Sequence, residues 1–402
     1  MTITTPDAAQ HIPHHATSSS AIAAGLAERF AETAAARDLA GGTPKVERDL
    51  LRESGLLKLS IPIEYGGLGA SWTETLGIVR QLARVDSSVA HVFAFHHLQL
   101  ASVRLFGTPA QWEPWLRDTA SQGWFWGNAL NPLDKRTVAT RVPGGREFSG
   151  RKSFCSGALD SDMLLASAVE DNADGKLIIA AIPTRRAGVT LFEDWDNMGQ
   201  RQTDSGSALF ERVAVAEGEI LSNPGPLSSP HACLRPLLAQ LIFVNVFLGI
   251  AEGAFAEARN YTRSQTRAWQ ASPAQQATED PYILAHYGEF WVSLEATRKL
   301  ADHAVARFDA AWNEGLALTE AGRGEVALAV ATAKVSATRG GLDLTSRIFE
   351  VTGARATTAA LRLDRYWRNL RVHTLHDPVD YKLRELGDWA LNGKHPKPSF
   401  YS

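Results

Sequence analysis

The sequence has few cysteines, and they form no pattern. Only Cys155 and Cys233 occur among the 402 residues, far apart and in no CxxC arrangement. A disulfide framework needs several paired cysteines, and a zinc site needs ligands at short, regular spacings. The cysteines therefore argue against both, and they fit a reducing cytoplasm, where we expect the protein to act.

An excess of one charge is also lacking. Lys and Arg total 41 and Asp and Glu total 44, which gives a net charge of -3, and no long run carries a single sign. Proteins that bind nucleic acid or acidic lipid rely on clustered positive charge. The sequence therefore predicts neither a nucleic-acid partner nor a membrane partner.

A secretory leader and a long apolar run are lacking as well. The first twenty residues have no basic start followed by an apolar stretch, so we expect no secretory signal. The most apolar segment, "PLLAQLIFVNVFLGIA" at 236–251, is too short to span a bilayer comfortably, and Gln240 and Asn245 interrupt it. A helix that is apolar nearly all round is buried on every side. This one is expected at the centre of a helix bundle or of an oligomer.

The residues that are present divide the chain into four parts. The predicted parts are a mobile tail at 1–19, an N-terminal helical domain at 20–118, a β-domain at 119–228, and a C-terminal helical bundle with its tail at 229–402. The first part contains His11, His14 and His15, which a solvated tail explains better than a metal site.

Capping residues mark two helices of the N-terminal domain. Ser71 and Glu74 have the spacing of a capping box and predict a helix that begins at residue 72. Asp86 or its neighbour can cap the next helix, which carries His91 and Phe95 one turn apart on the same face.

Between about residues 119 and 225 the sequence pattern changes to short segments rich in residues that favour β-strands. These segments are "EFSGRKSFCSG", "MLLASAVE", "KLIIAAIP", "GVTLF" and "SALFERVAV". The "DNADGK" stretch predicts a hairpin connection between two of them. Long helices then return, at about 233–270, 279–312, 319–351 and 358–374.

Several common catalytic motifs are absent. The chain has no P-loop and no GxSxG motif. Its "YGGLGA" stretch follows no strand of a βαβ unit, so it predicts a tight turn rather than a phosphate-binding loop. The "FCSG" stretch has no histidine nearby in sequence, so the sequence gives no catalytic triad.

The stretch "RVHTLHDPVDYK" at 371–382 has three interpretations. His373, His376 and Asp377 could be metal ligands, although this spacing alone is a weak motif. The histidines could instead bond the backbone at a helix end. The third interpretation, acid/base or hydrogen-bonding work in a pocket, agrees with other segments of the chain.

Those segments together resemble the acyl-CoA dehydrogenase fold. "SGLLKLSIPIEYGGLGASWTETLGIVRQLARVDSSVAHVF" resembles its N-terminal helical domain. "GRKSFCSGALDSDMLLASA" and "GVTLFEDWDNMGQRQTDSGSALFERVAV" resemble its β-domain, and "DRYWRNLRVHTLHD" resembles the helix and loop that end at its catalytic site. The resemblance covers nearly everything after residue 20. It implies a mainly α protein with a central, β-barrel-like middle domain and a C-terminal four-helix bundle.

Two departures separate the chain from the dehydrogenases of this fold. The family's glutamate base is matched here by His376, Asp377 and Pro378, and aspartate is one methylene shorter. The family's glycine-rich turn for the adenine half of FAD is matched by "VTGARAT", with Gly353 alone followed by Ala354 and Arg355. The departures predict a shorter flavin, FMN, with an arginine available for its phosphate.

Both departures are shared by two-component flavin monooxygenases, and the chain resembles the dibenzothiophene monooxygenase family in particular. The matching stretches are "RQTDSGS", "AQLIFVNVFLGIAEGA", "QQATEDPY", "YGEF", "RVHTLHDPVDYK" and "LNGKHP". The resemblance implies that a separate NAD(P)H:flavin reductase supplies reduced FMN (FMNH2). It also implies that O2 adds at the flavin C4a carbon and that the resulting hydroperoxide passes one oxygen to the substrate.

The resemblance also assigns site residues. His91 and His376 are expected to keep the peroxide protonated or to orient it, and histidine suits this because its pKa lies near neutrality. Asn128 and Ser156 are expected to hydrogen-bond the flavin edge or the peroxide. The predicted cofactor-binding residues are Asn128, Phe154, Ser156, Arg267, Arg368 and Asn369, with Arg267 reaching the flavin phosphate of a neighbouring subunit. The predicted substrate-pocket residues are Phe95, His96 and Trp195.

Each of these residues also has an ordinary structural explanation. His91 could be a core histidine with its hydrogen bonds satisfied, and Asn128 a turn residue. Ser156 could be a hydroxyl at a strand end, and Arg267 a member of a surface ion pair. It is the joint match to one family that favours the functional interpretation.

The substrate is expected to be a small aromatic or organosulfur compound, with a thiophene-type sulfur as the first choice. Phe95 stands where the dibenzothiophene enzymes have tyrosine, which removes a hydroxyl from the pocket. The aromatic "WFWGNAL" stretch suits a flat apolar ligand. Small alkyl sulfur compounds, aromatic amines and indoles remain alternatives, since related enzymes oxygenate nitrogen and carbon.

Two other functions compete with this interpretation. The first is an FAD-dependent acyl-CoA dehydrogenase with Asp377 as base, which would purify yellow and be bleached by an acyl-CoA. The second is a binding or assembly module without catalysis. The preferred interpretation is a cytoplasmic homotetramer with no metal, and with the 236–251 helix near the centre of the oligomer.

Overall fold

The computed structural model describes residues 18–402. The predicted mobile tail falls almost wholly outside this range, as do His11, His14 and His15. Within residues 18–402 the chain forms ten α-helices and seven β-strands. The first helix, α1 (Ser19–Ala40), begins at the last residue of the predicted tail, and the Ser18 side chain caps it.

The N-terminal part is helical, as predicted. After α1 come α2 (Lys45–Glu53), α3 (Trp72–Ala83), α4 (Ser87–Phe106) and α5 (Pro109–Gln122). Two predicted caps are confirmed: the Ser71 hydroxyl accepts the Glu74 N–H, and the Asp86 carboxylate accepts the Val89 N–H. Nearly every residue of α4 is buried, so this helix lies inside the molecule.

The middle part is one seven-stranded sheet. Its strands are β1 (Trp126–Ala129), β2 (Val138–Val142), β3 (Gly145–Lys152), β4 (Met163–Glu170), β5 (Leu177–Pro183), β6 (Val189–Leu191) and β7 (Ala208–Ala216). The strand order is β1-β4-β2-β3-β7-β6, with β5 pairing β4. The antiparallel β4–β5 pair confirms the predicted hairpin. β1 and β2 were not predicted, because neither has a clear alternation of apolar and polar residues.

The C-terminal part returns to helices. They are α6 (Leu234–Ser264), α7 (Pro281–Glu314), α8 (Glu320–Thr352), α9 (Asp364–Thr374) and α10 (Val379–Asn392). Asp280 caps α7 by accepting the N–H groups of Tyr282 and Ile283. The fourth predicted helix was too long at its start, since α9 begins at Asp364, and α10 was not predicted at all.

Helix α6 is the buried axis of this bundle. Within residues 18–402 it is the one helix long and apolar enough to cross a membrane, and its most apolar stretch is wholly buried inside the protein. Its burial is complete within a single chain, so the apolar sequence at 236–251 is explained by the bundle core without an oligomer.

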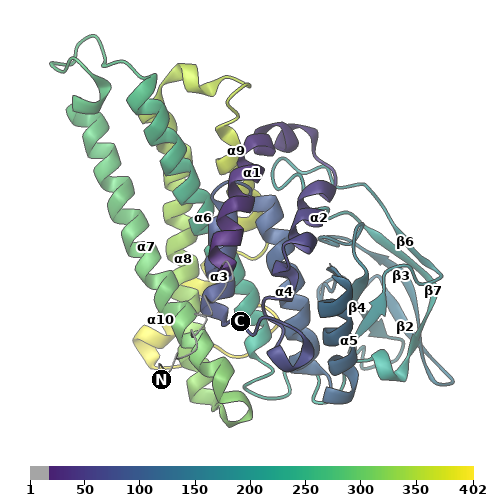
Figure 1. Cartoon of the computed structure of the whole chain (residues 1–402). Coiled ribbons are helices and arrows are strands. Elements are labelled where there is room, and N and C mark those ends of the chain that lie inside the picture. Colours follow the sequence, from purple (N-terminus) through teal and green to yellow (C-terminus); the bar gives the residue numbers. More distant parts are fainter. Residues whose placement is uncertain (1–17) are drawn as a thin grey trace, which may run out of the picture.

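The three parts lie side by side. The long helices α6, α7 and α8 stand together on one side of the molecule, the sheet stands on the other, and α1 to α4 lie between them (Figure 1). Helix α4 packs against both α6 and β1, so it connects the bundle to the sheet. Side chains from all three parts can therefore reach one site.

Candidate active site

A cavity of about 720 Å³ lies where α4, α6, the sheet and the end of α9 meet. Its walls are mainly aromatic and apolar, with a few polar groups. The residues that line it and matter below are His91, Phe95, Leu98, Asn128, Phe154, Ser156, Trp195, Thr203, Ser205, Arg235, Ala239, Gln240, Phe243, His373, His376 and Tyr401. A largely apolar cavity with a few convergent polar groups is typical of a small-molecule site.

Helix α4 supplies one wall. His91, Phe95 and Leu98 follow each other at helical spacing, so all three face the cavity. His91 is 4% exposed, and its ring centroid lies 4.1 Å from that of Phe95. Burial, with a smaller contribution from His376, lowers the pKa of His91 to about 3. The imidazole is therefore neutral at physiological pH and acts here as a hydrogen-bonding group, not as a cation.

Three histidines gather around one phenylalanine of α6. The ring of Phe243 lies 4.7 Å from His376, 5.3 Å from His373 and 6.0 Å from His91 between centroids. Nδ1 of His91 and Nδ1 of His373 are buried without a hydrogen-bond partner among the described residues. Between residues 18 and 402 no three His, Cys, Asp or Glu side chains are arranged to hold a metal ion.

His376 is positioned by an ion pair between Asp377 and Lys334. Its Nδ1 lies 3.1 Å from Asp377 Oδ1, and the same carboxylate oxygen lies 3.3 Å from Nζ of the buried Lys334. Lys334 also donates to the Gln240 side chain at 2.8 Å. Because a carboxylate can only accept, the Nδ1 of His376 carries a proton and donates it.

Asp377 is unsuited to act as a base. Burial raises its pKa, but the Lys334 ammonium and His376 outweigh this effect and hold the pKa below its ordinary value. A carboxylate that is paired with a buried cation and ionised well below neutrality has little affinity for a substrate proton. The geometry therefore speaks against the dehydrogenase alternative, in which Asp377 removes an α-proton.

The opposite wall comes from the sheet. Asn128 lies in β1, and its backbone N–H donates to the Ser156 carbonyl at 3.0 Å. The hydroxyls of Ser156, Ser205 and Thr203 form a chain with 2.7 Å between successive oxygens. Asn128 also accepts a hydrogen bond from Gln99 of α4 at 3.2 Å. The two predicted polar residues therefore lie on one wall, across the cavity from the histidines of α4 and α9.

Two aromatic side chains form an open part of the wall. Phe154 is 57% exposed and has a φ of 60°, a left-handed conformation that is rare for a bulky residue. Its ring lies 5.9 Å from that of Trp195, and the Trp195 indole N–H donates to the Gln200 carbonyl at 2.8 Å. The strained backbone turns Phe154 toward Trp195, which is consistent with a contact surface for a flat ring.

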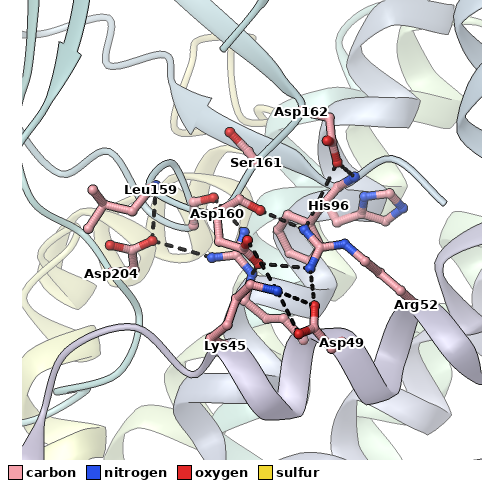
Figure 2. A network of polar contacts seen from close by, with 12 residues as sticks. Lys45, Asp49, Arg52, His96, Leu159, Asp160, Ser161, Asp162 and Asp204 are labelled. Atoms are coloured by element: carbon pink, nitrogen blue, oxygen red, sulfur yellow. Dashed lines mark hydrogen bonds and ion pairs between the residues drawn. The ribbon is translucent and has the colours of Figure 1, made fainter. Parts of the chain in front are cut away.

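The turn that carries Ser156 is fixed from outside the cavity by α2. Arg48 donates to the Gly157 carbonyl at 2.9 Å, and Arg52 donates to the Asp160 carbonyl at 2.7 Å and its carboxylate at 2.8 Å. Figure 2 shows Arg52 and Lys45 converging on Asp160, with Asp204 close by. We call these contacts of Lys45, Arg48 and Arg52 the α2 clamp.

The α2 clamp contains charges that water hardly reaches. Burial raises the pKa of Asp204 to about 7, and it lowers the pKa of Arg48 to about 10. Arg48 and Asp204 lie 3.3 Å apart, and the Asp204 carboxylate also accepts the Leu159 N–H at 3.0 Å. The clamp therefore connects α2 to the turn that follows Ser156 and, through Asp204, to the loop that carries Thr203 and Ser205.

His96 does not line the cavity, so its predicted place in the substrate pocket is corrected. It lies 140° around α4 from His91 at a helical period of 3.6 residues. Its Nε2 donates to the Leu57 carbonyl at 2.7 Å, and its Nδ1 accepts the Trp126 N–H at 3.1 Å. Figure 2 shows it beside the α2 clamp. His96 is a core residue that joins α4 to β1.

Arg368 and Asn369 also lie outside the cavity lining, in place of the direct flavin contact predicted for them. Arg368 pairs with Asp38 at 2.6 Å and donates to the Met198 carbonyl at 2.6 Å. The Asn369 side chain accepts the Gln200 N–H at 2.7 Å. Both residues hold the loop that carries Met198, which does line the cavity.

Arg267 lies in a different place. It is exposed and lines a second, more open pocket of about 950 Å³, together with Arg355, Trp269 and Tyr282. From the sequence, Arg355 was expected to be available for the flavin phosphate, and Arg267 was expected to reach the flavin phosphate of a neighbouring subunit. In a single chain neither arginine lines the cavity with the histidines.

Several cavity residues were not predicted. Thr203 and Ser205 were inside the matching "RQTDSGS" stretch, and the residue types could have indicated them as hydrogen-bonding groups. His373 belonged to the stretch for which pocket work was one interpretation, but it was not named among the site residues. Arg235 and Phe243 lie on α6, and Arg235 directly precedes the apolar run at 236–251.

The cavity residues fit the flavin that the sequence resemblance implies. Phe154 and Trp195 offer apolar ring faces, and Asn128 and Ser156 offer hydrogen-bonding groups beside them. The Nε2 of His91 makes no hydrogen bond to the described residues and is available to a ligand, whereas Nδ1 is closed off by its neighbours. These residues would hold the isoalloxazine ring. Among the described residues that line the cavity, no exposed lysine or arginine is available for the flavin phosphate.

Two family models match the chain. The acyl-CoA dehydrogenase N-terminal domain matches residues 13–123, and the acyl-CoA dehydrogenase C-terminal domain matches residues 241–381. Together they cover more than half of the sequence and bracket the sheet that supplies Asn128 and Ser156.

Similar proteins agree over nearly the whole length. A probable FMNH2-dependent monooxygenase, SfnC of Pseudomonas putida, is 64% identical over 95% of this chain and 97% of its own. The structure of methanesulfinate monooxygenase MsuC of Pseudomonas fluorescens matches with a TM-score of 0.95 and 65% identity, covering 96% of this chain and all of that one. The FMN-bound structure of TdsC of Paenibacillus sp. A11-2 matches with a TM-score of 0.91 and 43% identity, covering 95% and 99% of the two chains. The chain therefore belongs to the acyl-CoA dehydrogenase family, within its branch of FMNH2-dependent monooxygenases.

Proposed function

We propose that this monooxygenase oxygenates the sulfur atom of a small organosulfur compound, with an alkanesulfinate as the favoured substrate. The observation that carries the proposal is the largely apolar cavity lined by neutral His91, whose Nε2 makes no hydrogen bond to the described residues and remains accessible to a ligand. The 65% identity with a structure described as a methanesulfinate monooxygenase supports the choice of sulfinate.

The proposed reaction balances with O2 as oxidant and reduced FMN as reductant. A sulfinate RSO2⁻, O2 and FMNH2 give a sulfonate RSO3⁻, water and oxidised FMN. One oxygen atom forms a bond to sulfur, the O–O bond breaks, and the second oxygen leaves as water with the two hydrogens of the flavin. A separate NAD(P)H:flavin reductase is the proposed source of FMNH2.

The protein's own residues have to exclude water and hold hydrogen bonds. Reduced FMN supplies the electrons that activate O2 when it is bound. Neutral His91 can donate or accept one hydrogen bond at Nε2 without bringing a charge into the cavity. His376 is oriented by Asp377, and the apolar side chains of Phe95, Leu98 and Phe243 keep the space dry.

We further propose that the site is completed by a neighbouring subunit. Arg267 and Arg355 share a pocket at the end of the bundle, where Trp269, Tyr282 and Leu284 expose large apolar surfaces. Exposed apolar patches of this kind are typical of subunit contacts. In a homotetramer these arginines would bind the phosphate of an FMN held in the neighbour's cavity. The cytoplasm, with its NAD(P)H, is the proposed location.

A thiophene-type substrate is the second candidate. The apolar rings of Phe95 and Phe243 and the size of the cavity suit a flat aromatic molecule. TdsC, which is 42% to 43% identical to this chain, has been crystallised with indole and with FMN and indole together. Amine and indole oxygenation therefore remain alternatives on the same chemistry.

The test is a reconstituted reaction with labelled oxygen. The full chain, a flavin reductase, NADH and FMN are supplied with ¹⁸O2 and, in separate reactions, with methanesulfinate, dibenzothiophene or indole. We expect one ¹⁸O atom in methanesulfonate at the highest kcat/KM of the three. A second assay offers an acyl-CoA and an artificial electron acceptor. Dehydrogenation in that assay, or O2 reduction to hydrogen peroxide with no labelled product from any compound, would overturn the proposal.

A further inference from the structure

One buried arginine in the cavity has no counter-ion. Arg235 lies in the first turn of α6, is 6% exposed and lines the cavity. Its Nε donates to the Ser102 hydroxyl of α4 at 3.1 Å. Among the described residues, no carboxylate lies within 4.0 Å of it, and its two terminal nitrogens have no hydrogen-bond partner there.

Other buried arginines of the chain behave differently. Arg48 pairs with Asp160 and Asp204, Arg146 pairs with Glu170, and Arg365 pairs with Glu257. Arg323 has no carboxylate partner either, but it donates to the Pro396 carbonyl and is not a cavity residue. Among the described residues, Arg235 is therefore the buried arginine that lines the cavity and has terminal N–H groups without a partner.

Such an arrangement is costly unless a ligand completes it. Burial lowers the pKa of Arg235 to about 10, so the guanidinium still carries its charge at neutral pH. A buried charge without a partner loses its hydration and gains nothing in return. The N-terminus of α6 adds a further partial positive charge at the same place. This end of the cavity therefore attracts a negative group.

The guanidinium lies on the same helix face as the aromatic centre of the site. Arg235, Ala239 and Phe243 are spaced by one turn each, and all three line the cavity. Tyr401 connects the two ends: its ring lies 6.0 Å from that of His376, and its charged form and Arg235 each shift the pKa of the other. Arg235 and the histidines thus face one shared space.

We propose that Arg235 binds the anionic oxygens of the substrate and makes the enzyme selective for organic sulfinates over neutral sulfur compounds. This inference rests on the proposed sulfur oxygenation and adds a specificity-determining residue to it. A guanidinium can hold two oxygens of one acid group through parallel hydrogen bonds. A sulfinate bound in this way keeps its sulfur lone pair free, and that lone pair forms the new S–O bond.

The same contact predicts how the product behaves. A sulfonate has three oxygens and no sulfur lone pair, so it can occupy Arg235 without reacting further. Alkanesulfonates should therefore bind the enzyme and compete with the sulfinate. This gives a measurement of the subsite that does not depend on turnover.

A second source of the same oxyanion chemistry is the phosphate of FMN. Arg235 is 6% exposed and Phe154 is 57% exposed, so the flavin face formed by Phe154 and Trp195 opens outward, while Arg235 is enclosed. This difference favours the substrate as the anion. The experiment below separates the two sources.

The test compares Arg235→Met, which keeps the length of the side chain without its charge, with Arg235→Lys, which keeps the charge. Calorimetry with methanesulfonate is expected to show binding to the wild-type chain and a loss of about 100-fold or more in Arg235→Met, with partial recovery in Arg235→Lys. The KM for methanesulfinate should rise in parallel. Binding of FMN, and hydrogen peroxide release in the absence of substrate, should stay within about twofold of wild type, since neither uses this contact. Arg212→Met, on the exposed side of the sheet, serves as the surface control.

Two results would overturn the inference. Unchanged methanesulfonate binding in Arg235→Met would show that the anion binds elsewhere, even if sulfinates are oxygenated. Loss of FMN binding with intact methanesulfonate binding would assign the guanidinium to the flavin phosphate. Should the wild-type chain bind methanesulfonate through Arg235 but fail to oxygenate methanesulfinate, the proposed reaction would fail and the subsite would stand. If Arg235→Met does not fold, Arg235→Lys and Arg235→Gln give the same comparison.

Discussion

His91 and His96 lie five residues apart on α4 and share every simple property of a buried histidine. They are 4% and 0% exposed, and burial lowers the pKa of each to about 3. They differ in their hydrogen bonds. Both ring nitrogens of His96 have backbone partners, whereas Nδ1 of His91 has none and its ring lines the cavity.

The comparison teaches what marks a functional histidine in this protein. Neither burial nor a shifted pKa separates the two residues. Unmet hydrogen-bonding capacity at a cavity does, because a buried polar atom without a partner is unfavourable unless a ligand uses it. Three predictions test whether this difference has the consequences we assign to it.

The largest effect is expected on turnover. His91→Phe, which keeps a flat ring but removes both nitrogens, should reduce sulfinate oxygenation by about 100-fold to 10,000-fold, because the hydrogen bond at the reacting group is lost. Uncoupled release of hydrogen peroxide should take its place. The measurement is the ratio of sulfonate formed to NADH consumed. A coupled, near-normal turnover would show that the free nitrogen of His91 is not used.

The next effect is expected on stability. His96→Ala leaves the Leu57 carbonyl and the Trp126 N–H without partners and removes buried volume, so it should lower the free energy of unfolding by about 2 to 4 kcal/mol. Denaturant unfolding monitored by tryptophan fluorescence measures this loss. Below the new melting temperature, the coupling ratio should remain that of wild type. A folded His96→Ala chain that is fully uncoupled would erase the distinction between the two histidines.

The smallest effect is expected on the pH dependence of stability, and here the two histidines should behave alike. Their folded pKa of about 3 lies below the ordinary value of 6.5, so the unfolded chain binds more protons between these values. Their contribution is complete above about pH 6.5 and is lost as the pH falls toward 3, with a slope of at most about 1.4 kcal/mol per pH unit for each.

The check is denaturant unfolding at several pH values. His91→Phe and His96→Phe should each lose up to one histidine's share of the slope between pH 6.5 and 4. Equal losses would show that burial is the dominant cause of both pKa shifts. An unchanged slope in either variant would contradict the assigned shift.

The sequence predicted best what is encoded locally. Ser71 and Asp86 begin α3 and α4 because their side chains cap the adjacent N–H groups, and the β4–β5 hairpin follows from the residues of its own turn. Strand β1 was missed because "WGNA" is short, is buried throughout and pairs with a strand more than thirty residues away. The residues next to β1 in the sequence therefore do not indicate which strand it pairs with.

The residues of the site could be predicted from the sequence only in part. His91, Asn128, Ser156 and His376 came from the resemblance to a family, and they do line one cavity. The prediction for His96 could have been avoided, since helical period separates it from the face of His91 and Phe95. The role of Arg235 could not be predicted from the sequence, because the absence of a carboxylate around a side chain is a property of the whole fold.

The α2 clamp determines which side of the cavity can move when ligands enter and leave. Arg48 and Arg52 anchor the Ser156 turn from its outer side, and neither arginine is a cavity residue. The sheet side therefore works as a rigid joint between an early helix and the middle of the chain. Motion that admits and releases small molecules is expected on the other side instead, where the His376 side chain is 42% exposed and its one ion-pair contact, to Asp377, comes from the adjacent residue.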